Sequence, residues 1–406
     1  FRNVTGVQTC ALPISAMKNI LYGTTALIAV SLVAGSAGAA EKIKLGLGGY
    51  WRAAIQVGDG DNDAPSGSAL ATDNRSHGFG RESEIYFSGK TTLDNGIKFG
   101  VMVQLEGETS GDQMDNSYIW ADGSFGRIEY GETWGPALLM SYGRVGEMID
   151  GFGNFGSHFP IGTGTPNGLG INDYGGGAGL ASTPETKMNY FTPRMSGFQL
   201  GLSYMPENGA TNSRGSGLDS KLGGTTANEI VDVGANYTGK LGSASVKGFV
   251  NWFTSETEAT AVGVASGKDA DGYGGGLQIG FSGFQIGGKF TKINDIGAGG
   301  AAIAAGSPGT DRETYTLGVQ YNTGPWGVGA QYIRAQQEIL VGGVKSTRDD
   351  QTEYVSVGGT YNLGPGIKLF GGVQFWDFED SANIANASPA TEGEATVGVI
   401  GTKFSF

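Results

Sequence analysis

The chain has almost no cysteine and almost no histidine, which removes several kinds of chemistry at once. Its single cysteine, Cys10, lies close to the start of the 406 residues. Disulfides, thiolate metal sites and cysteine nucleophiles are therefore excluded from the rest of the chain. His77 and His158 are the only histidines, and we expect both in loops. Two scattered histidines supply neither a metal triad nor a Ser-His pair, so we expect no enzyme activity.

Long apolar runs and an excess of basic residues are also missing. After Ala40 no segment approaches the roughly 18 uninterrupted apolar residues of a membrane helix. Residues 1–40 hold two basic residues and no acidic ones, so residues 41–406 keep 24 basic against 39 acidic residues, a net charge of −15. A chain this acidic is a poor binder of nucleic acid.

The first residues are typical of an export signal. Residues 17–40 have a basic start at Lys18, an apolar centre and a small-residue site at 37–39, which together indicate a secretory signal peptide. We expect a cleaved chain that begins near Glu41; a membrane anchor is the alternative. Residues 1–16 resemble the translation of a sequencing-library adapter, and we interpret them as a non-native extension rather than a genuine one.

Glycine is abundant, with 75 residues, and aromatic residues are plentiful. Average proteins hold only about 7% glycine. No collagen-like triplet is present, and the regular recurrence of aromatic and β-branched residues argues against disorder. An exported, glycine-rich and aromatic chain without membrane helices has the profile of an outer-membrane barrel, in which each strand gives only a weak alternation signal.

Such alternation runs along the whole of residues 41–406. In the stretch 97–106, Ile97, Phe99 and Val101 fall on one face, whereas Lys98 and Gln104 fall on the other. A period of two indicates a strand between two different environments. We expect sixteen strands near residues 42–57, 80–93, 96–108, 114–122, 125–133, 186–193, 197–205, 229–238, 243–254, 271–282, 284–293, 313–322, 326–336, 352–362, 367–377 and 393–406.

The connections between these segments alternate in length. Tight turns rich in Gly, Asn, Asp and Pro, such as 94–96 and 364–366, alternate with long polar stretches such as 206–228 and 294–312. Short turns on one rim and long loops on the other are typical of outer-membrane barrels. An even strand number lets the last strand pair with the first and close the sheet. We therefore predict an all-β fold, a sixteen-stranded antiparallel transmembrane β-barrel.

The end of the chain, "VIGTKFSF", has one apolar face that carries Phe404 and Phe406. We expect this strand to seal the barrel against the strand that starts at Lys42, with the apolar face toward lipid or a neighbouring subunit. Trp51, Trp326 and Trp376, which lie near predicted strand ends, fit aromatic girdles at the membrane interfaces.

Several segments resemble the general porins of Gram-negative bacteria. "FSGKTTLDNGIKFGVMVQLE" is similar to their second hairpin, "FGRIEYGETWGP" to the strand that leads into their constriction loop, and "MNYFTPRMSGFQLGLSYMP" to a turn and the strand after it. Phe406 resembles the terminal aromatic residue that the barrel-assembly machinery recognises. The resemblance spans nearly all of residues 41–406. It implies a homotrimeric diffusion channel for small hydrophilic solutes, surrounded by outer-membrane lipid and lipopolysaccharide.

The resemblance also implies that the longest loop, residues 134–185, folds inward and narrows the pore. Its acidic side would consist of Glu147 and Asp150, with Asp173 further along. Opposite charges across a narrow pore orient polar solutes, and an excess of acidic residues favours cations, so we expect mild cation selectivity. The alternative is that these acidic residues are ordinary solvated loop residues.

The expected basic side comes from the first strands. Its members are Lys44, Arg52, Arg81, Lys98 and Arg127. For Arg81 the first external loop is an alternative place. One departure from the family matters, because Glu84 stands where the family often has a wall arginine. The basic wall is therefore expected to be weaker here.

A weak metal signal occurs in "DGDNDAP", which places Asp59, Asp61 and Asp63 in an expected loop that resembles the start of a calcium loop. The glycine at the sixth position and the distal glutamate are missing, which excludes an EF-hand. A loosely bound divalent cation such as calcium and a solvated acidic loop remain as alternatives, and we expect no other cofactor.

Other functions on the same scaffold stay open. A substrate-selective channel would need a recognition track along the lumen, and a barrel that acts mainly as a surface adhesin or receptor would work through its long loops. A barrel enzyme would need Ser and His on adjacent strands at the lumen rim. A soluble glycine-rich β protein is the remaining alternative.

Overall fold

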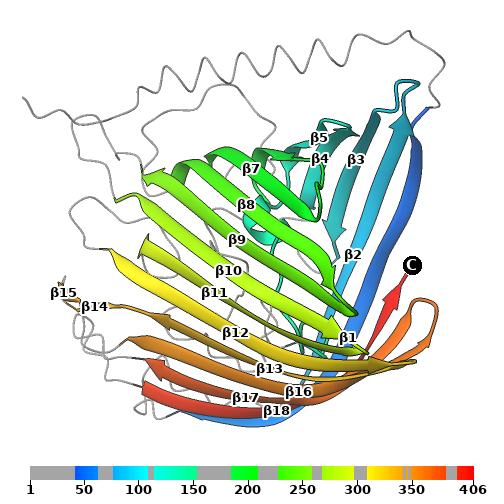
Figure 1. Cartoon of the computed structure of the whole chain (residues 1–406). Helices are drawn as coiled ribbons and strands as arrows, with labels where there is room; N and C mark the ends of the chain where they lie inside the picture. Colours follow the sequence, from blue (N-terminus) through cyan, green and yellow to red (C-terminus); the bar gives the residue numbers. More distant parts are fainter. Residues whose placement is uncertain are drawn as a thin grey trace, which may run out of the picture.

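The structure is a computed structural model, and it describes residues 42–62, 76–107, 114–152, 184–208, 227–257, 268–296, 309–341, 344–345, 349–380 and 391–406. These residues form a closed antiparallel barrel of sixteen strands (Figure 1). The barrel strands are β1 (Lys44–Asn62), β2 (His77–Thr92), β3 (Lys98–Glu106), β4 (Met114–Gly123), β5 (Gly126–Glu132), β6 (Thr186–Phe191), β7 (Phe198–Glu207), β8 (Ala227–Leu241), β9 (Ala244–Thr257), β10 (Ala270–Phe281), β11 (Phe284–Ile296), β12 (Thr310–Thr323), β13 (Trp326–Gln337), β16 (Asp350–Gly364), β17 (Ile367–Asp380) and β18 (Thr391–Ser405).

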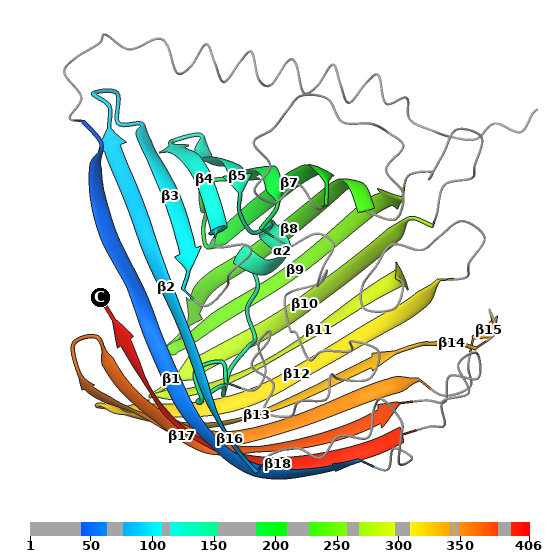
Figure 2. The same cartoon turned by 180° about the vertical axis from the view of Figure 1, so that it is seen from behind.

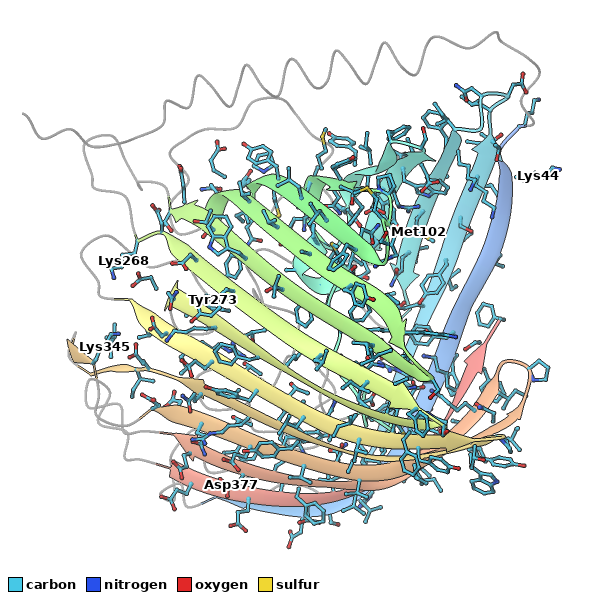
Figure 3. All side chains as sticks on the ribbon, viewed as in Figure 1. Lys44, Met102, Lys268, Tyr273, Lys345 and Asp377 are labelled. Atoms are coloured by element: carbon cyan, nitrogen blue, oxygen red, sulfur yellow. The ribbon has the colours of Figure 1, made fainter. Side chains whose placement is uncertain are left out.

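The predicted fold class is confirmed, since each of the sixteen expected segments is a strand of the barrel. A separate two-stranded sheet, β14 (Leu340–Val341) with β15 (Val344–Lys345), lies in the connection between β13 and β16. Lys268 and Lys345 mark the rim from which the long connections leave, whereas Lys44 lies at the rim of the short turns (Figure 3). No helix among the described residues has the length and apolar character needed to cross a membrane.

The barrel closes where β18 pairs with β1. Trp51 stands opposite Phe404 in this register, and their ring centroids are 6.4 Å apart. The terminal residue continues the pairing, because the Phe406 amide donates to the Gly49 carbonyl at 3.1 Å and the Gly49 amide donates to the Phe406 backbone oxygen at 3.0 Å. Phe404 and Phe406 are exposed on the outer face. The expected closure by the last strand is thus confirmed.

The two faces of the wall differ as the alternation predicts. On β12, Leu317 is 60% exposed on the outside, whereas the neighbouring Thr316 is fully buried inside. An apolar exterior with a polar interior is the reverse of a soluble core and suits a barrel in lipid. Trp326 faces outward, but Trp376 faces inward and packs on Tyr354 with ring centroids 4.6 Å apart. The expectation that Trp376 belongs to an outer girdle is therefore wrong.

The barrel wall has two heights. Strand β5 has 7 residues and β6 has 6, whereas β8, two strands beyond β6, has 15 and β12, further around the barrel, has 14. Figure 2 shows the short strands beside the long, steeply tilted ones. We call β3–β6 the low wall and the remaining barrel strands the tall wall.

Strand β1 is longer than expected, which alters the interpretation of the acidic stretch at its end. Asp59 and Asp61 lie on the strand, paired with Thr396 and Glu394, and not in a loop. Alternate residues of a strand are about 6.6 Å apart along its axis, so these residues do not wrap a cation as a calcium loop does. Asp63 lies outside the described residues.

The histidines also need a correction. His77 is the first residue of β2, whereas both histidines were expected in loops. His158 lies outside the described residues. In the described part of the chain, no group of three His, Cys, Asp or Glu residues is placed to hold a metal ion.

Candidate pore constriction

Residues 133–152 leave β5 and run inside the barrel along its inner wall. The short helix α2 (Pro136–Leu139) lies within the barrel in Figure 2, next to β7, β8 and β9. Asp232 on β8 accepts the Ala137 amide at 3.0 Å, and Asn251 on β9 donates to the Ala137 carbonyl at 3.1 Å. Because these buried backbone groups find partners on the wall, the start of the loop is fixed in place.

The segment then crosses one strand after another. The Gly146 amide donates to Gln320 on β12 at 3.2 Å, and Gln331 on β13 donates to the Val145 carbonyl at 3.3 Å. At the far end Gln374 on β17 donates to the Phe152 carbonyl. The expected inward fold of the loop is therefore observed for residues 134–152, while residues 153–183 lie outside the described residues.

Glycines on the inner wall make room for this path. A Cβ at Gly201 would lie 2.5 Å from Met140 Sδ, and a Cβ at Gly287 would lie 2.6 Å from Val145 Cγ2. Real Cβ atoms do not approach other atoms so closely, so a larger residue would displace the loop. We name the wall glycines at which an added Cβ would lie within 3.1 Å of a loop atom the glycine seat: Gly80, Gly201, Gly234, Gly287, Gly318, Gly329, Gly358 and Gly372.

The glycine seat was not identified in the sequence, where glycine counted only as composition. The signal that could have revealed it is the recurrence of glycine at lumen-facing positions of many strands. Such positions in wide barrels otherwise carry polar side chains.

Asp150 joins the loop to three basic side chains of the wall. Its Oδ1 lies 3.0 Å from Lys368 Nζ and 3.6 Å from Lys403 Nζ, and Arg52 donates to its backbone carbonyl. The side chain is 12% exposed. Its φ of 55° lies in the left-handed region, which aspartate tolerates better than most residues. Of the residues proposed for the two sides of the pore, the structure brings together Asp150 and Arg52.

Lys368 and Lys403 were missed by sequence reasoning. Both lie on inward faces of alternating segments, β17 and β18, and this was a usable signal. The resemblance directed attention to the first strands, whereas barrel closure places β18 directly beside β1 and β17 next to β18.

Glu147 has a different contact from Asp150. Its Oε1 accepts the Gly151 amide at 2.6 Å, so it closes the turn that presents Asp150. Asp173 lies outside the described residues.

The other expected basic residues are spread out. Lys44 and Lys98 take lumen-facing positions close to the short-turn rim, where Lys44 is seen in Figure 3. Arg127 lies near the same rim, 2.6 Å from a Glu129 oxygen. Arg81 stands opposite Ala53, on the outward face of β2, so its expected place in the pore wall is not supported.

Acidic groups occupy the wall where a basic side was expected. Arg52 is paired with Glu82, at 2.5 Å from Nε to Oε2. Glu84 accepts hydrogen bonds from Tyr50 Oη at 2.7 Å, Tyr86 Oη at 2.5 Å and Gln104 Nε2 at 2.6 Å. Glu84, which stands where the family often has an arginine, therefore lies in the middle of this wall.

Comparison with known proteins gives one family and several structural neighbours. A family model described as Gram-negative porin matches residues 23–381. No curated protein sequence matches the chain. Among solved structures, the anion-selective porin from Comamonas acidovorans has a TM-score of 0.58 at 18% identity, with 90% of this chain and 100% of that chain covered.

Two further neighbours show the same architecture. OmpT of Vibrio cholerae, in vitro folded and in trimer form, has a TM-score of 0.56 at 12% identity, covering 90% of this chain and 100% of its own. OmpF of Salmonella typhi, in complex with daunomycin, has a TM-score of 0.54 at 13% identity, covering 90% and 98%. At these identities the neighbours establish the fold alone. The closed barrel, the loop inside it and the family match together show that the chain belongs to the Gram-negative porin family.

Proposed function

We propose that the chain forms a water-filled channel through the outer membrane for passive diffusion of small hydrophilic solutes and ions, and that it is not an enzyme. The observation that carries this proposal is the loop segment 133–152 held against the inner wall of a sixteen-stranded barrel. Barrels of sixteen strands are wide enough to leave an aqueous path. A loop along the wall narrows that path and sets which solutes pass.

We further propose a mild preference for cations. Three basic residues at the constriction lie against acidic ones: Arg52 pairs with Glu82, and Lys368 and Lys403 share Asp150. Glu84, in contrast, has only neutral hydrogen-bond donors among the described residues. The carboxylate of Glu84 is therefore a negative charge on the inner wall that no basic side chain offsets through a hydrogen bond, and negatively charged walls favour cations.

The low wall supports a homotrimer. A strand needs about 9–11 residues to cross the hydrocarbon of a membrane, and β5 and β6, with 7 and 6, fall short. Their outward side chains include Tyr130 and Met188, which are 54% and 46% exposed. A surface that is apolar but too low for lipid fits contact with neighbouring subunits.

Export and assembly follow from the termini. Removal of residues 17–40 as a signal peptide would release the chain for the barrel-assembly machinery, with Phe406 as its recognition residue, and lipopolysaccharide would surround the tall wall. N-terminal sequencing of the protein from membranes tests the cleavage. Nucleic acid is not an expected partner. Loose binding of a divalent cation such as calcium by Asp59, Asp61 and Asp63 stays a separate proposal, which calcium titration followed by calorimetry would test.

Planar-bilayer recording of the purified protein in a potassium chloride gradient tests the channel. We expect conductance that steps in threes, with a reversal potential of cation-selective sign. Anion selectivity would contradict the charge argument and assign the constriction to Lys368 and Lys403. Correctly folded barrels without conductance would overturn the channel itself.

Cysteine labelling tests the low wall, because residues 41–406 contain no cysteine of their own. With a membrane-soluble maleimide, we expect Met188→Cys to be protected and Leu317→Cys on the tall wall to react. Equal reaction at both positions would argue against the trimer.

A further inference from the structure

Large aromatic rings follow the lumen face of β1–β4. Tyr50 and Tyr86 have ring centroids 6.3 Å apart, in an edge-to-face arrangement. The set continues across the sheet, since Tyr118 stands opposite Met102, and Trp120 fills the space above Gly100. All four rings are partly exposed. We call Tyr50, Glu84, Tyr86, Gln104, Tyr118 and Trp120 the open wall.

Two of these rings already hold a cation of the chain itself. Lys403 Nζ lies 4.1 Å from the centroid of Tyr50, and Arg127 Cζ lies 4.4 Å from that of Trp120. Both distances are within the roughly 6 Å at which a cation is attracted to a ring face. The ammonium group of Lys403 and the guanidinium group of Arg127 thus indicate the kind of ligand, an organic cation, that these ring faces can bind. Among the described residues, Tyr86 has no such cation over its ring.

The carboxylate behind the open ring adds to this preference. Glu84 is 9% exposed, and the hydroxyl groups of Tyr50 and Tyr86 both donate to it. Donation from a phenol to a carboxylate pushes electron density into the ring, and the buried negative charge itself attracts cations. Of the rings of the open wall, that of Tyr86 therefore has the most favourable surroundings for binding a cation.

A buried amide beside Glu84 gives a second, independent observation. Asn116 is 4% exposed, and its Nδ2 donates to Gln104 Oε1 at 3.2 Å and to Asp115 Oδ2 at 2.6 Å. Its Oδ1 has no hydrogen-bond partner among the described residues. Buried acceptors normally find a donor, so the unpartnered oxygen of Asn116 leaves a partial negative charge on this side of the network, and this charge favours the approach of a cation.

We propose that the open wall is a binding site for small organic cations, which rest with their ammonium group over Tyr86 beside Glu84 during passage. The inference rests on the proposed function as a channel and adds a substrate class to it. A hydrated potassium ion keeps its water and gains little from a ring. An organic ammonium ion holds water weakly and gains both the ring face and the carboxylate.

Reversal potentials in mixed tetramethylammonium and potassium chloride measure this preference. We expect the permeability of tetramethylammonium relative to potassium to exceed the ratio of their mobilities in water. Tyr86→Leu removes the ring and should lower that ratio about two- to fivefold, as loss of one cation–π contact implies. Tyr86→Phe keeps the ring and should lower it less, and Glu84→Gln should lower it by removing the charge.

Tyr315→Leu is the matched control, because Tyr315 is an outward-facing tyrosine on β12. The ratio should be unchanged in this variant. A ratio equal to that in water for the natural sequence, or one that Tyr86→Leu leaves unchanged, would overturn the inference while the channel proposal stands. Absence of any potassium conductance would instead refute the channel proposal.

Discussion

Two parts of the inner wall of this barrel differ in the size of their residues, since one is lined by glycine and the other by large side chains. From β7 to β17, and at Gly80 on β2, the wall carries the glycine seat, and the loop lies directly on it. On β1–β4 the open wall carries large aromatic and acidic side chains. Even glycine serves a different purpose there, because Gly100 accommodates the ring of Trp120 and not the loop. Small residues thus mark where the loop approaches the wall, and large residues mark where side chains face the solute.

We expect the largest effect when a glycine of the glycine seat is replaced by a residue with a side chain. In Gly318→Ala the new Cβ would overlap the Val145 carbonyl oxygen, which cannot rotate away. Overpacking of this kind costs about 1–3 kcal/mol, enough to drive the loop from the wall in a large share of molecules. We expect higher single-channel conductance and weaker ion selectivity.

Gly248→Ala is the matched control for the seat. Gly248 lies on β9 with an outward-facing position, and a Cβ there would be 3.5 Å from the nearest atom, an ordinary contact. Conductance like that of the natural sequence in both variants would mean that the loop is not seated by glycine.

The next test concerns Asp150, where the loop meets the wall. Asp150→Asn keeps the left-handed backbone, which asparagine also tolerates, but removes the charge between Lys368 and Lys403. A unit charge at 4 Å is worth about 1 kcal/mol in water, so the cation-to-anion permeability ratio should fall roughly fivefold. Reversal potentials in a salt gradient give this ratio, and no shift would show that Asp150 lies away from the ion path.

A smaller effect is expected at the start of the seat. Asn251→Ala removes the donor to the Ala137 carbonyl, and a single hydrogen bond contributes about 0.5–1.5 kcal/mol. We expect more frequent current flicker as the loop detaches briefly. Ser245→Ala, which removes an exposed bond to Gly280, is the control and should leave the noise unchanged.

The smallest effect should come from the external mouth, outside both walls. Lys345 donates to Glu338 at 2.5 Å, and this hydrogen bond raises the pKa of Lys345 above its usual 10.5. The pair is therefore fully formed below pH 10.5 and is lost as the pH rises through the raised pKa. Since both side chains are partly exposed, Lys345→Met should lower the free energy of unfolding at pH 8 by less than about 1 kcal/mol.

The same substitution has a readout at Asp349. Burial and the charges of Glu338 and Asp350 raise the pKa of Asp349, while Lys345 lowers it in part. Lys345→Met should therefore raise this pKa further, which a carboxyl NMR titration would detect. An unchanged Asp349 titration would show that the two groups are not coupled.

The sequence by itself determined the sixteen strands, the face that each residue takes and the closure by the last strand. These properties are local, because a period of two follows from the strand backbone, and the contrast between lipid and water acts on each residue separately. Even Trp376 takes the inward face that the alternation of its own segment indicates. The expectation of an outer girdle was wrong because it was based on the residue type alone.

Only the tertiary structure decided which charges meet. Alternation states the face of a residue but not its height in the barrel, and so Lys44 and Arg52 looked equivalent although they lie at different levels. Asp150 reaches Lys368 across 218 positions of sequence because closure pairs β18 with β1 and places β17 next to β18. The path of the loop was likewise set by the inner surface of the finished barrel. Such contacts depend on register and closure, which no short stretch of residues encodes.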